Sequence, residues 1–287
     1  MAVAVVTDST AYLPEGFADR RGISVVPLHV TVDDRTGLDG VDVTPTSLAA
    51  ALAERRAVST SRPSPEDIGA VYRRVLDSGA DSIVSVHLSR ELSGTWDAAR
   101  IAAEQVGDVR VVDSRSTAMG LGFAVLAAVN AARSGADGAE VEAAAVRTAA
   151  RTRTFFCLET LEHLRRGGRI GPAAALLGTA LAVRPLLHVQ DGRIVPLEKV
   201  RTTSRAMARL VDLAADAAGD GPAGIAVHHL CAPQRAAELA SRLDERLTGG
   251  EGSLISEVGA VIGAHTGVGV LGVVVLPGGL APNPPGA

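Results

Sequence analysis

The sequence contains few cysteines and few aromatic residues. Cys157 and Cys231 are the only cysteines among 287 residues, and aromatic side chains make up 2% of the chain. Two cysteines are too few for a disulfide framework or a cysteine-rich metal site, and two small buried thiols in a reducing cytoplasm are the simpler interpretation. Because hydrophobic residues still reach 47% of the chain, we expect a large core of alanine, valine and leucine.

The chain also lacks an excess of charge of either sign. Its 28 lysines and arginines against 32 aspartates and glutamates give a formal net charge of −4. This balance gives no reason to expect nucleic acid or an anionic membrane as a partner. The first residues are apolar, but they carry no basic segment and meet Asp8 at once. We therefore predict a first strand and not a signal peptide.

Motifs for several common chemistries are missing or out of context. The chain has no G-x-x-x-x-G-K-[ST] sequence, no H-E-x-x-H sequence and no cluster of cysteine and histidine. We therefore expect neither a P-loop for ATP nor a metal site, and no cofactor. Residues 267–272 match G-x-G-x-x-G, but an apolar strand-like run follows them where a dinucleotide site needs a helix.

One uncharged run approaches the length of a membrane span. Val258–Leu276 is nineteen residues long and contains five glycines, with His265 and Thr266 in its middle. A helix with so much glycine would be poor. We predict two buried strands joined by a glycine-rich turn, and a membrane helix is the less favoured alternative.

Strand-like and helix-like segments alternate along the first half of the chain. We predict strands at 3–6, 23–32, 82–88 and 109–113, a polar loop at 33–40, and helices at 46–56, 66–78, from 96 onwards and at 119–134. This alternation predicts an α/β fold whose N-terminal parallel sheet is covered by helices on both faces.

The length of the chain favours two α/β domains. We place them at 1–150 and 151–280, with a frayed tail at 281–287 that is rich in proline and glycine. In the second domain we predict a helix stopped by Gly167-Gly168 and a hairpin turn at Asp191-Gly192. An apolar helix at 173–182 contains many small residues, as in 173–178, which either leave space for a ligand or pack tightly.

Hydroxyl side chains gather where the predicted parallel strands end. They occupy 7–10, 89–95 and 114–117, and 59–61 could reach the same crevice. Ligands of open parallel sheets bind beyond the carboxyl ends of the strands. Ser93-Gly94-Thr95 leads into a helix, whose first N–H groups and dipole favour a carboxylate or phosphate. The alternative is that Ser93 or Thr95 only caps this helix.

His265 also has two interpretations. A histidine in an apolar run is usually a satisfied core residue, but Gly263 and Gly267 give a ligand room to approach it. An imidazole donor there could compensate a buried carboxylate. Together with Ser93 and Asp8, His265 would alternatively form a Ser-His-Asp hydrolase site for acyl groups or esters. Ser93 lacks the G-x-S-x-G elbow of such enzymes, which disfavours this alternative.

Several motifs occur in the order and spacing of one known family. They are Thr7-Asp8-Ser9-Thr10, the segment 59–65, Leu92-Ser93-Gly94-Thr95, the segments 159–161 and 166–170, and 263–267. On these motifs, residues 3 to about 277 resemble the DegV family. The resemblance implies a two-domain α/β protein that binds one long-chain fatty acid, with its carboxylate at the domain interface and its tail in an apolar tunnel.

The resemblance also implies a partner. Characterised relatives are carrier subunits of bacterial fatty acid kinase. They present the carboxylate to a separate ATP-binding subunit, which makes acyl phosphate for phospholipid metabolism. The carrier would then be a cytoplasmic lipid-binding subunit and not an enzyme on its own, with at most a transient membrane contact.

Site residues follow from the same motifs. Carried over one by one, the head-group site falls on Thr60, Ser61, Ser93, Gly94, His265 and Thr266. Arg169 matches an arginine of the head-group or kinase-facing surface. Arg62 stands where relatives often have glutamine, which either alters the head-group contacts or changes nothing.

Overall fold

The computed structural model describes residues 2–176, 183–247 and 252–280. Within these ranges the chain forms two compact units, the first made of 2–28 with 62–151 and the second of 29–61 with 152–279. The continuous domains expected at 1–150 and 151–280 differ from these units in one segment, because 29–61 folds with the second unit. The expected frayed tail, 281–287, lies outside the described residues.

A four-stranded sheet with the order β2-β1-β6-β7 forms the centre of the first unit. All neighbouring strands are parallel, which confirms the predicted N-terminal sheet. The strands are β1 Val3–Asp8, β2 Ile23–Val26, β6 Ser82–His87 and β7 Val109–Asp113. Their carboxyl ends therefore lie at one edge of the sheet.

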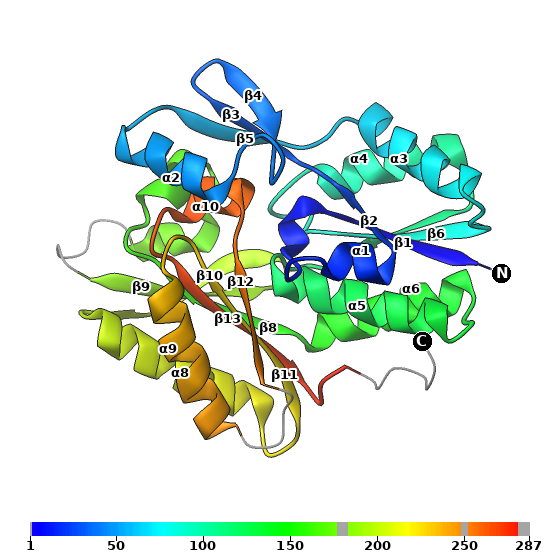
Figure 1. The fold of residues 1–287 in the computed structure, drawn as a ribbon. Coiled ribbons are helices and arrows are strands. Elements are labelled where there is room, and N and C mark those ends of the chain that lie inside the picture. The colour runs from blue at the N-terminus through cyan, green and yellow to red at the C-terminus, as the bar shows by residue number, and fades with distance from the viewer. Residues whose placement is uncertain (1, 177–182, 248–251, 281–287) are drawn as a thin grey trace. The chain divides into compact units, whose positions relative to one another are not determined.

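Helices cover both faces of this sheet. They are η1 Ser9–Ala11, α1 Phe17–Arg21, α3 Pro65–Asp77, α4 Thr95–Val106, α5 Met119–Arg133 and α6 Gly138–Arg151. Within this unit, α3 and α4 lie on one side of the strands and α5 and α6 on the other (Figure 1). At the start of α3, Ser64 and Asp67 form a capping box around Pro65 at the first helical position. The helix therefore begins at Pro65, one residue before the predicted start at 66.

The second unit contains a six-stranded sheet with the order β10-β9-β8-β13-β11-β12. Neighbours are antiparallel except β11 and β12, which are parallel. The strands are β8 Arg153–Cys157, β9 Arg184–Gln190, β10 Arg193–Val200, β11 Ala223–His229, β12 Ser253–Glu257 and β13 Leu271–Pro277. The hairpin predicted at Asp191-Gly192 joins β9 and β10, with positive φ angles of 52° and 80°.

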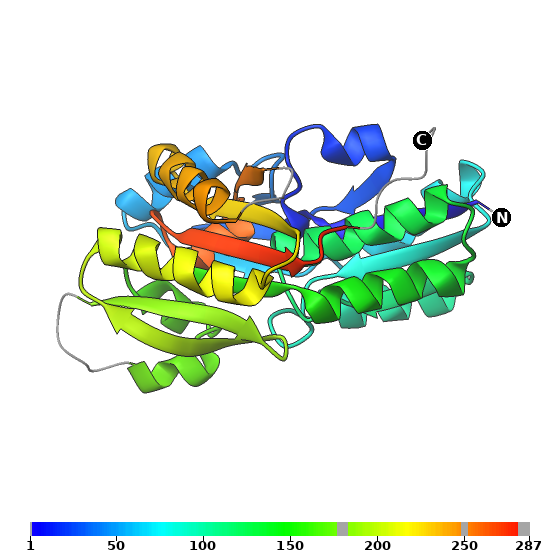
Figure 2. The same cartoon turned by 90° about the horizontal axis from the view of Figure 1, so that it is seen from below.

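Two long helices, α8 Thr203–Ala218 and α9 Pro233–Arg246, pack against this sheet. They contact each other and run roughly along the strands in Figure 2. They bury Met207, Leu210, Leu239 and Leu243 against residues of β8, β9, β11 and β13. Shorter elements of the unit are α7 Glu162–Arg166, η2 Gly171–Leu176 and α10 Ala260–Thr266. The helix predicted at 173–182 is wrong over its described part, which is the 3-10 turn η2, and 177–182 lie outside the described residues.

Residues 29–61 form a small antiparallel sheet with the order β4-β3-β5 and the helix α2 Pro45–Ala53. Its strands are β3 His29–Val32, β4 Arg35–Leu38 and β5 Val58–Ser61. The single strand predicted at 23–32 is therefore two strands, β2 and β3, in different sheets. Pro27 lies between them and has no N–H to donate to a strand ladder. The loop predicted at 33–40 contains β4, which pairs with β3 through a turn where Asp33 has a φ of 53°.

The prediction of two strands in 258–276 is wrong for the first of them, which is the helix α10. Gly267 ends this helix with a φ of 76°. At its other end, the buried Asp39 carboxylate accepts hydrogen bonds from the N–H groups of Ala260 (2.8 Å) and Val261 (3.3 Å). Gly263 lets the helix pack closely on Leu48, because a Cβ there would collide with the leucine methyl group. No helix in the described ranges has the length and apolar character needed to cross a membrane.

Candidate functional site

The hydroxyl clusters predicted at the strand ends of the first unit do share one edge of its sheet. We call residues 7–10, 89–95 and 114–117 the hydroxyl edge. Backbone hydrogen bonds join its loops. The N–H of Ser89 donates to the carbonyl of Ser116 (2.8 Å), and the N–H of Ala118 donates to the carbonyl of Thr10 (2.8 Å). The edge is thus one connected structure built from the ends of β1, β6 and β7.

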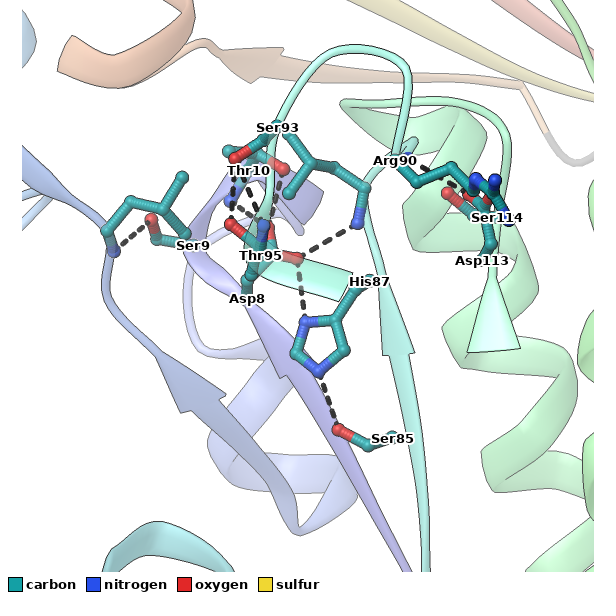
Figure 3. A network of polar contacts seen from close by, with 12 residues as sticks. Asp8, Ser9, Thr10, Ser85, His87, Arg90, Ser93, Thr95, Asp113 and Ser114 are labelled. Atoms are coloured by element: carbon teal, nitrogen blue, oxygen red, sulfur yellow. Dashed lines mark hydrogen bonds and ion pairs between the residues drawn. The ribbon is translucent and has the colours of Figure 1, made fainter. Parts of the chain in front are cut away.

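Asp8 organises the interior of the hydroxyl edge, which the sequence did not reveal. One carboxylate oxygen accepts from the N–H (3.0 Å) and hydroxyl (2.6 Å) of Thr10. The other accepts from the N–H of Leu88 (2.9 Å) and contacts Nδ1 of His87 (3.0 Å), whose Nε2 lies 2.7 Å from Oγ of Ser85 (Figure 3). Asp8, Ser85 and His87 are all fully buried. This network fixes the strand ends and is closed to solvent.

Ser93 and Gly94 lie at the start of α4 in the same unit. The Ser93 hydroxyl lies 2.9 Å from that of Thr95 and accepts a hydrogen bond from the Thr95 N–H (3.3 Å). The N-cap of α4 is Gly94, which offers no side-chain cap. Neither Ser93 nor Thr95 is therefore the N-cap that the alternative interpretation required. The Arg62 guanidinium rests against Gly94, where a Cβ would collide with it.

In the second unit, Thr60 and His265 meet across 205 residues of sequence. Thr60 is on β5 and His265 is in the last turn of α10, and Oγ1 of Thr60 lies 2.8 Å from Nε2 of His265. Nδ1 of His265 is buried and has no hydrogen-bond partner within the described residues. The predicted tight turn at His265 is instead a helix C-terminus. The room for a ligand expected at Gly263 and Gly267 is taken by Leu48 and Leu230 at the first glycine and by the His163 ring at the second.

The environment of His265 keeps its ring uncharged. Burial, together with the nearby charges of Arg169 and His163, lowers the pKa of His265 to about 4. A neutral imidazole carries one N–H and one free nitrogen lone pair. In either tautomer a single hydrogen bond joins the ring to Thr60. Because the hydroxyl can both donate and accept, Thr60 can bond His265 and an anion together.

The remaining predicted residues of this unit differ in their surroundings. Arg169 is half-buried, and its Nη1 donates to the carbonyl of Gly167 (2.7 Å). Ser61 is exposed at the end of β5. The Thr266 hydroxyl donates to the carbonyl of Ile262 (3.1 Å), which satisfies it inside its own helix. The structure thus brings together Thr60, His265 and Arg169 in the second unit, whereas Ser93 and Gly94 belong to the first.

The hydrolase alternative finds no support in these contacts. Asp8, its candidate orienting acid, is occupied by Thr10, His87 and Leu88. His265 bonds Thr60 and no carboxylate among the described residues. Within those residues there is also no group of three or more histidines, cysteines, aspartates or glutamates that could hold a metal ion.

A family model described as "uncharacterised protein, DegV family" matches residues 2–278. The chain belongs to the DegV family. A DegV domain-containing protein of Streptomyces coelicolor is 57% identical to this DegV chain over 274 residues, which cover 95% of this chain and 98% of the relative. Protein DegV of Bacillus subtilis is 34% identical over 278 residues, 95% of this chain and 98% of its own length.

Solved structures of DegV proteins share the fold. A fatty-acid-binding DegV family protein of Thermus thermophilus superposes with a TM-score of 0.92 and 35% identity, covering 96% of this chain and 100% of its own. DegV of Bacillus subtilis, described as a fatty acid binding protein, gives a TM-score of 0.87 at 32% identity over 96% and 99% of the two chains. These matches confirm the two-part α/β architecture that the sequence predicted.

Proposed function

We propose that this DegV protein binds one long-chain fatty acid without transforming it. The observation that carries the proposal is the uncharged Thr60–His265 pair beside Arg169, in a chain whose structural relatives from Thermus thermophilus and Bacillus subtilis are fatty-acid-binding proteins. Hydrogen-bond donors next to a fixed positive charge suit a carboxylate. Arg169 supplies that charge while the imidazole stays neutral.

The head-group contacts would come from the residues that the family motifs named. Thr60 would donate to the carboxylate while Nε2–H of His265 donates to the Thr60 hydroxyl. Ser93 and the N–H groups beside Gly94 are further candidate donors from the family motifs. Ser61 and Thr266 remain weaker candidates, because Ser61 is exposed and the Thr266 hydroxyl already donates inside α10. The acyl tail would occupy an apolar tunnel.

The tail and the head group would make different contributions. Burying about fifteen methylene groups at roughly 0.8 kcal/mol each supplies on the order of 12 kcal/mol before ordering costs. A hydrogen bond to a charged group contributes about 1.5 to 3 kcal/mol. Affinity would therefore depend mainly on the tail, and the hydroxyl and imidazole groups would determine where the carboxylate is held.

The bound carboxylate would be presented to a separate ATP-binding kinase subunit, which would form acyl phosphate for phospholipid synthesis. This part of the proposal rests on the family resemblance and on the sequence, which contains no G-x-x-x-x-G-K-[ST] loop for the phosphates of ATP. A cytoplasmic carrier acting with such a partner would need no catalytic residues of its own.

The first experiment is native mass spectrometry of the purified protein, followed by denaturing extraction and mass analysis of what is released. One fatty acid per chain supports the proposal and identifies the preferred chain length. A protein that is empty and also takes up neither oleate nor palmitate contradicts it.

A second experiment addresses the partner. The loaded protein is incubated with ATP, first alone and then with a bacterial lysate depleted of this protein. Acyl phosphate that appears only with the lysate supports a separate kinase subunit. Acyl phosphate formed by the protein alone contradicts the carrier role. Release of a free alcohol from a chromogenic ester, abolished in Ser93→Ala, would instead revive the hydrolase alternative.

A further inference from the structure

Two short helices of the second unit each end against the other's histidine. α7 carries His163 and ends at Gly167, while α10 carries His265 and ends at Gly267. A Cβ on Gly167 would collide with Nδ1 and Cε1 of the His265 ring, and a Cβ on Gly267 would collide with Cδ2 and Nε2 of His163. Each C-cap glycine therefore leaves the space that the imidazole of the other helix occupies.

Gly167 is required for space and not for its backbone conformation. Its φ of −75° and ψ of −4° are right-handed and open to any residue. The next residue, Gly168, has the opposite properties: its φ is +69°, but a Cβ there would meet nothing within 4 Å. Gly167 is thus needed for the space that the imidazole occupies, and Gly168 is needed for its left-handed backbone.

The space at Gly167 determines where His265 makes its hydrogen bond. Nε2 lies 2.8 Å from Thr60 Oγ1, and the Nδ1 side of the ring faces Gly167. A methyl group at position 167 fits only if the ring moves, which disturbs the bond to Thr60. Arg169 holds the Gly167 peptide through its 2.7 Å hydrogen bond, so the end of α7 resists moving instead.

We propose that Gly167 is a positioning residue for His265, a role that rests on the proposed binding of a fatty acid carboxylate. Gly167 does not contact the ligand. It leaves the space that fixes the plane of the imidazole, so that His265 holds the Thr60 hydroxyl in one orientation towards the carboxylate. Packing of His163 against Gly267 fixes the end of α10 from the opposite direction.

The test compares Gly167→Ala with its matched control Gly168→Ala in the full chain. Nitrogen-15 NMR of histidine-labelled protein reports the tautomer and hydrogen bonding of the seven imidazoles, and His265→Ala assigns the His265 signals. Titration with oleate measures affinity. We expect Gly167→Ala to shift the His265 signals and to weaken oleate binding about tenfold or more, the effect of one hydrogen bond to a charged group. Gly168→Ala lowers the unfolding midpoint but changes neither readout.

The double variant Gly167→Ala/His265→Ala completes the design. With the ring removed, the added methyl group should have no further effect on oleate affinity, and if Gly167→Ala alone fails to fold, the double variant should fold. Unchanged His265 signals in Gly167→Ala, equal losses of affinity in Gly168→Ala, or a double variant that does not fold would each overturn the proposal. If the unmodified protein binds no oleate, the proposed function fails, whereas the NMR comparison still decides the role of Gly167.

Discussion

Two histidines of this DegV protein differ in their hydrogen bonds. We call an environment closed when both ring nitrogens have a partner and open when only one has. His87, in the first unit, is fully buried, with Nδ1 on Asp8 and Nε2 on Ser85. His265, in the second unit, bonds Thr60 through Nε2, and its Nδ1 has no partner within the described residues. Both nitrogens of the His87 ring have partners, one of them the Asp8 carboxylate, so this ring links β6 to β1. A neutral ring next to Arg169 is suited to an anion.

The largest effect on stability should come from removing the carboxylate that bonds His87. Asp8→Ala leaves the donors of Thr10, His87 and Leu88 buried without an acceptor. We expect the free energy of unfolding to fall by about 3 to 5 kcal/mol, as for a broken buried network. Urea unfolding measures this, with the exposed Asp97→Ala as a control that changes stability by less than about 0.5 kcal/mol. A loss below about 1 kcal/mol for Asp8→Ala would show that the network is not structural.

The next effect is the pH dependence of stability. Burial lowers the pKa of His228 and of His265 to about 4, below the unfolded value near 6.5. Between these values the unfolded chain binds more protons than the folded one, so stability is full above about pH 6.5 and is lost as the pH falls towards 4. We expect a loss on the order of 3 kcal/mol from the fully buried His228 and less from the half-buried His265.

Urea unfolding at pH 7, 5.5 and 4 checks this expectation. His265→Gln should make the decline shallower, because its own contribution is removed while that of His228 remains. A slope that is the same in His265→Gln and in the unmodified chain would mean that the pKa of His265 does not differ between the folded and unfolded states.

A substitution in the open environment, at Thr60, should change stability less than the substitutions above and should mainly change the affinity for oleate. Thr60→Val removes the hydroxyl and keeps the shape of the side chain, so we expect oleate affinity to fall about tenfold. The ligand-free protein should lose less than about 1 kcal/mol of stability. Methyl oleate, which has no charged head group, is the control and should bind both forms alike. If stability falls and affinity does not, the Thr60–His265 pair is structural, like His87.

The smallest effect is expected at Arg62. Its guanidinium is exposed and lies against Gly94, beside the predicted Ser93 contact. Arg62→Gln should weaken oleate binding only about twofold to threefold at low salt, and the difference should vanish near 0.5 M salt, since exposed charges are screened. A difference that persists at high salt would mean that Arg62 touches the carboxylate directly.

Local signals in the sequence predicted much of the fold. The alternation of strands and helices predicted the parallel sheet, the strand at 109–113 coincides with β7, and the Asp191-Gly192 dipeptide predicted a hairpin. Each of these depends on residues that are neighbours in sequence. The same local rules misread Ile23–Val32 as one strand, because an apolar run with one proline does not show that its halves join different sheets.

Features that depend on distant residues could not be read in this way. Asp8 and His87 are 79 positions apart, and Asp39 caps α10 from 221 positions away. Without that cap, the glycine-rich run before β13 looks like a poor helix, which is why α10 was predicted as a strand. Thr60 and His265 were candidates from the hydroxyl cluster, the glycine-flanked histidine and the family resemblance, but only the structure shows their bond and the space at Gly167 that positions it.

Because residues 29–61 fold with the second unit, the two units become complete at different times during synthesis of the chain. β5 packs with α10, yet Thr60 is synthesised 205 residues before His265, an interval of about 10 to 40 s at roughly 5 to 20 residues per second. The first unit can close once Arg151 has left the ribosome. The early strands β3, β4 and β5 can reach α10 only after nearly the whole chain has been made.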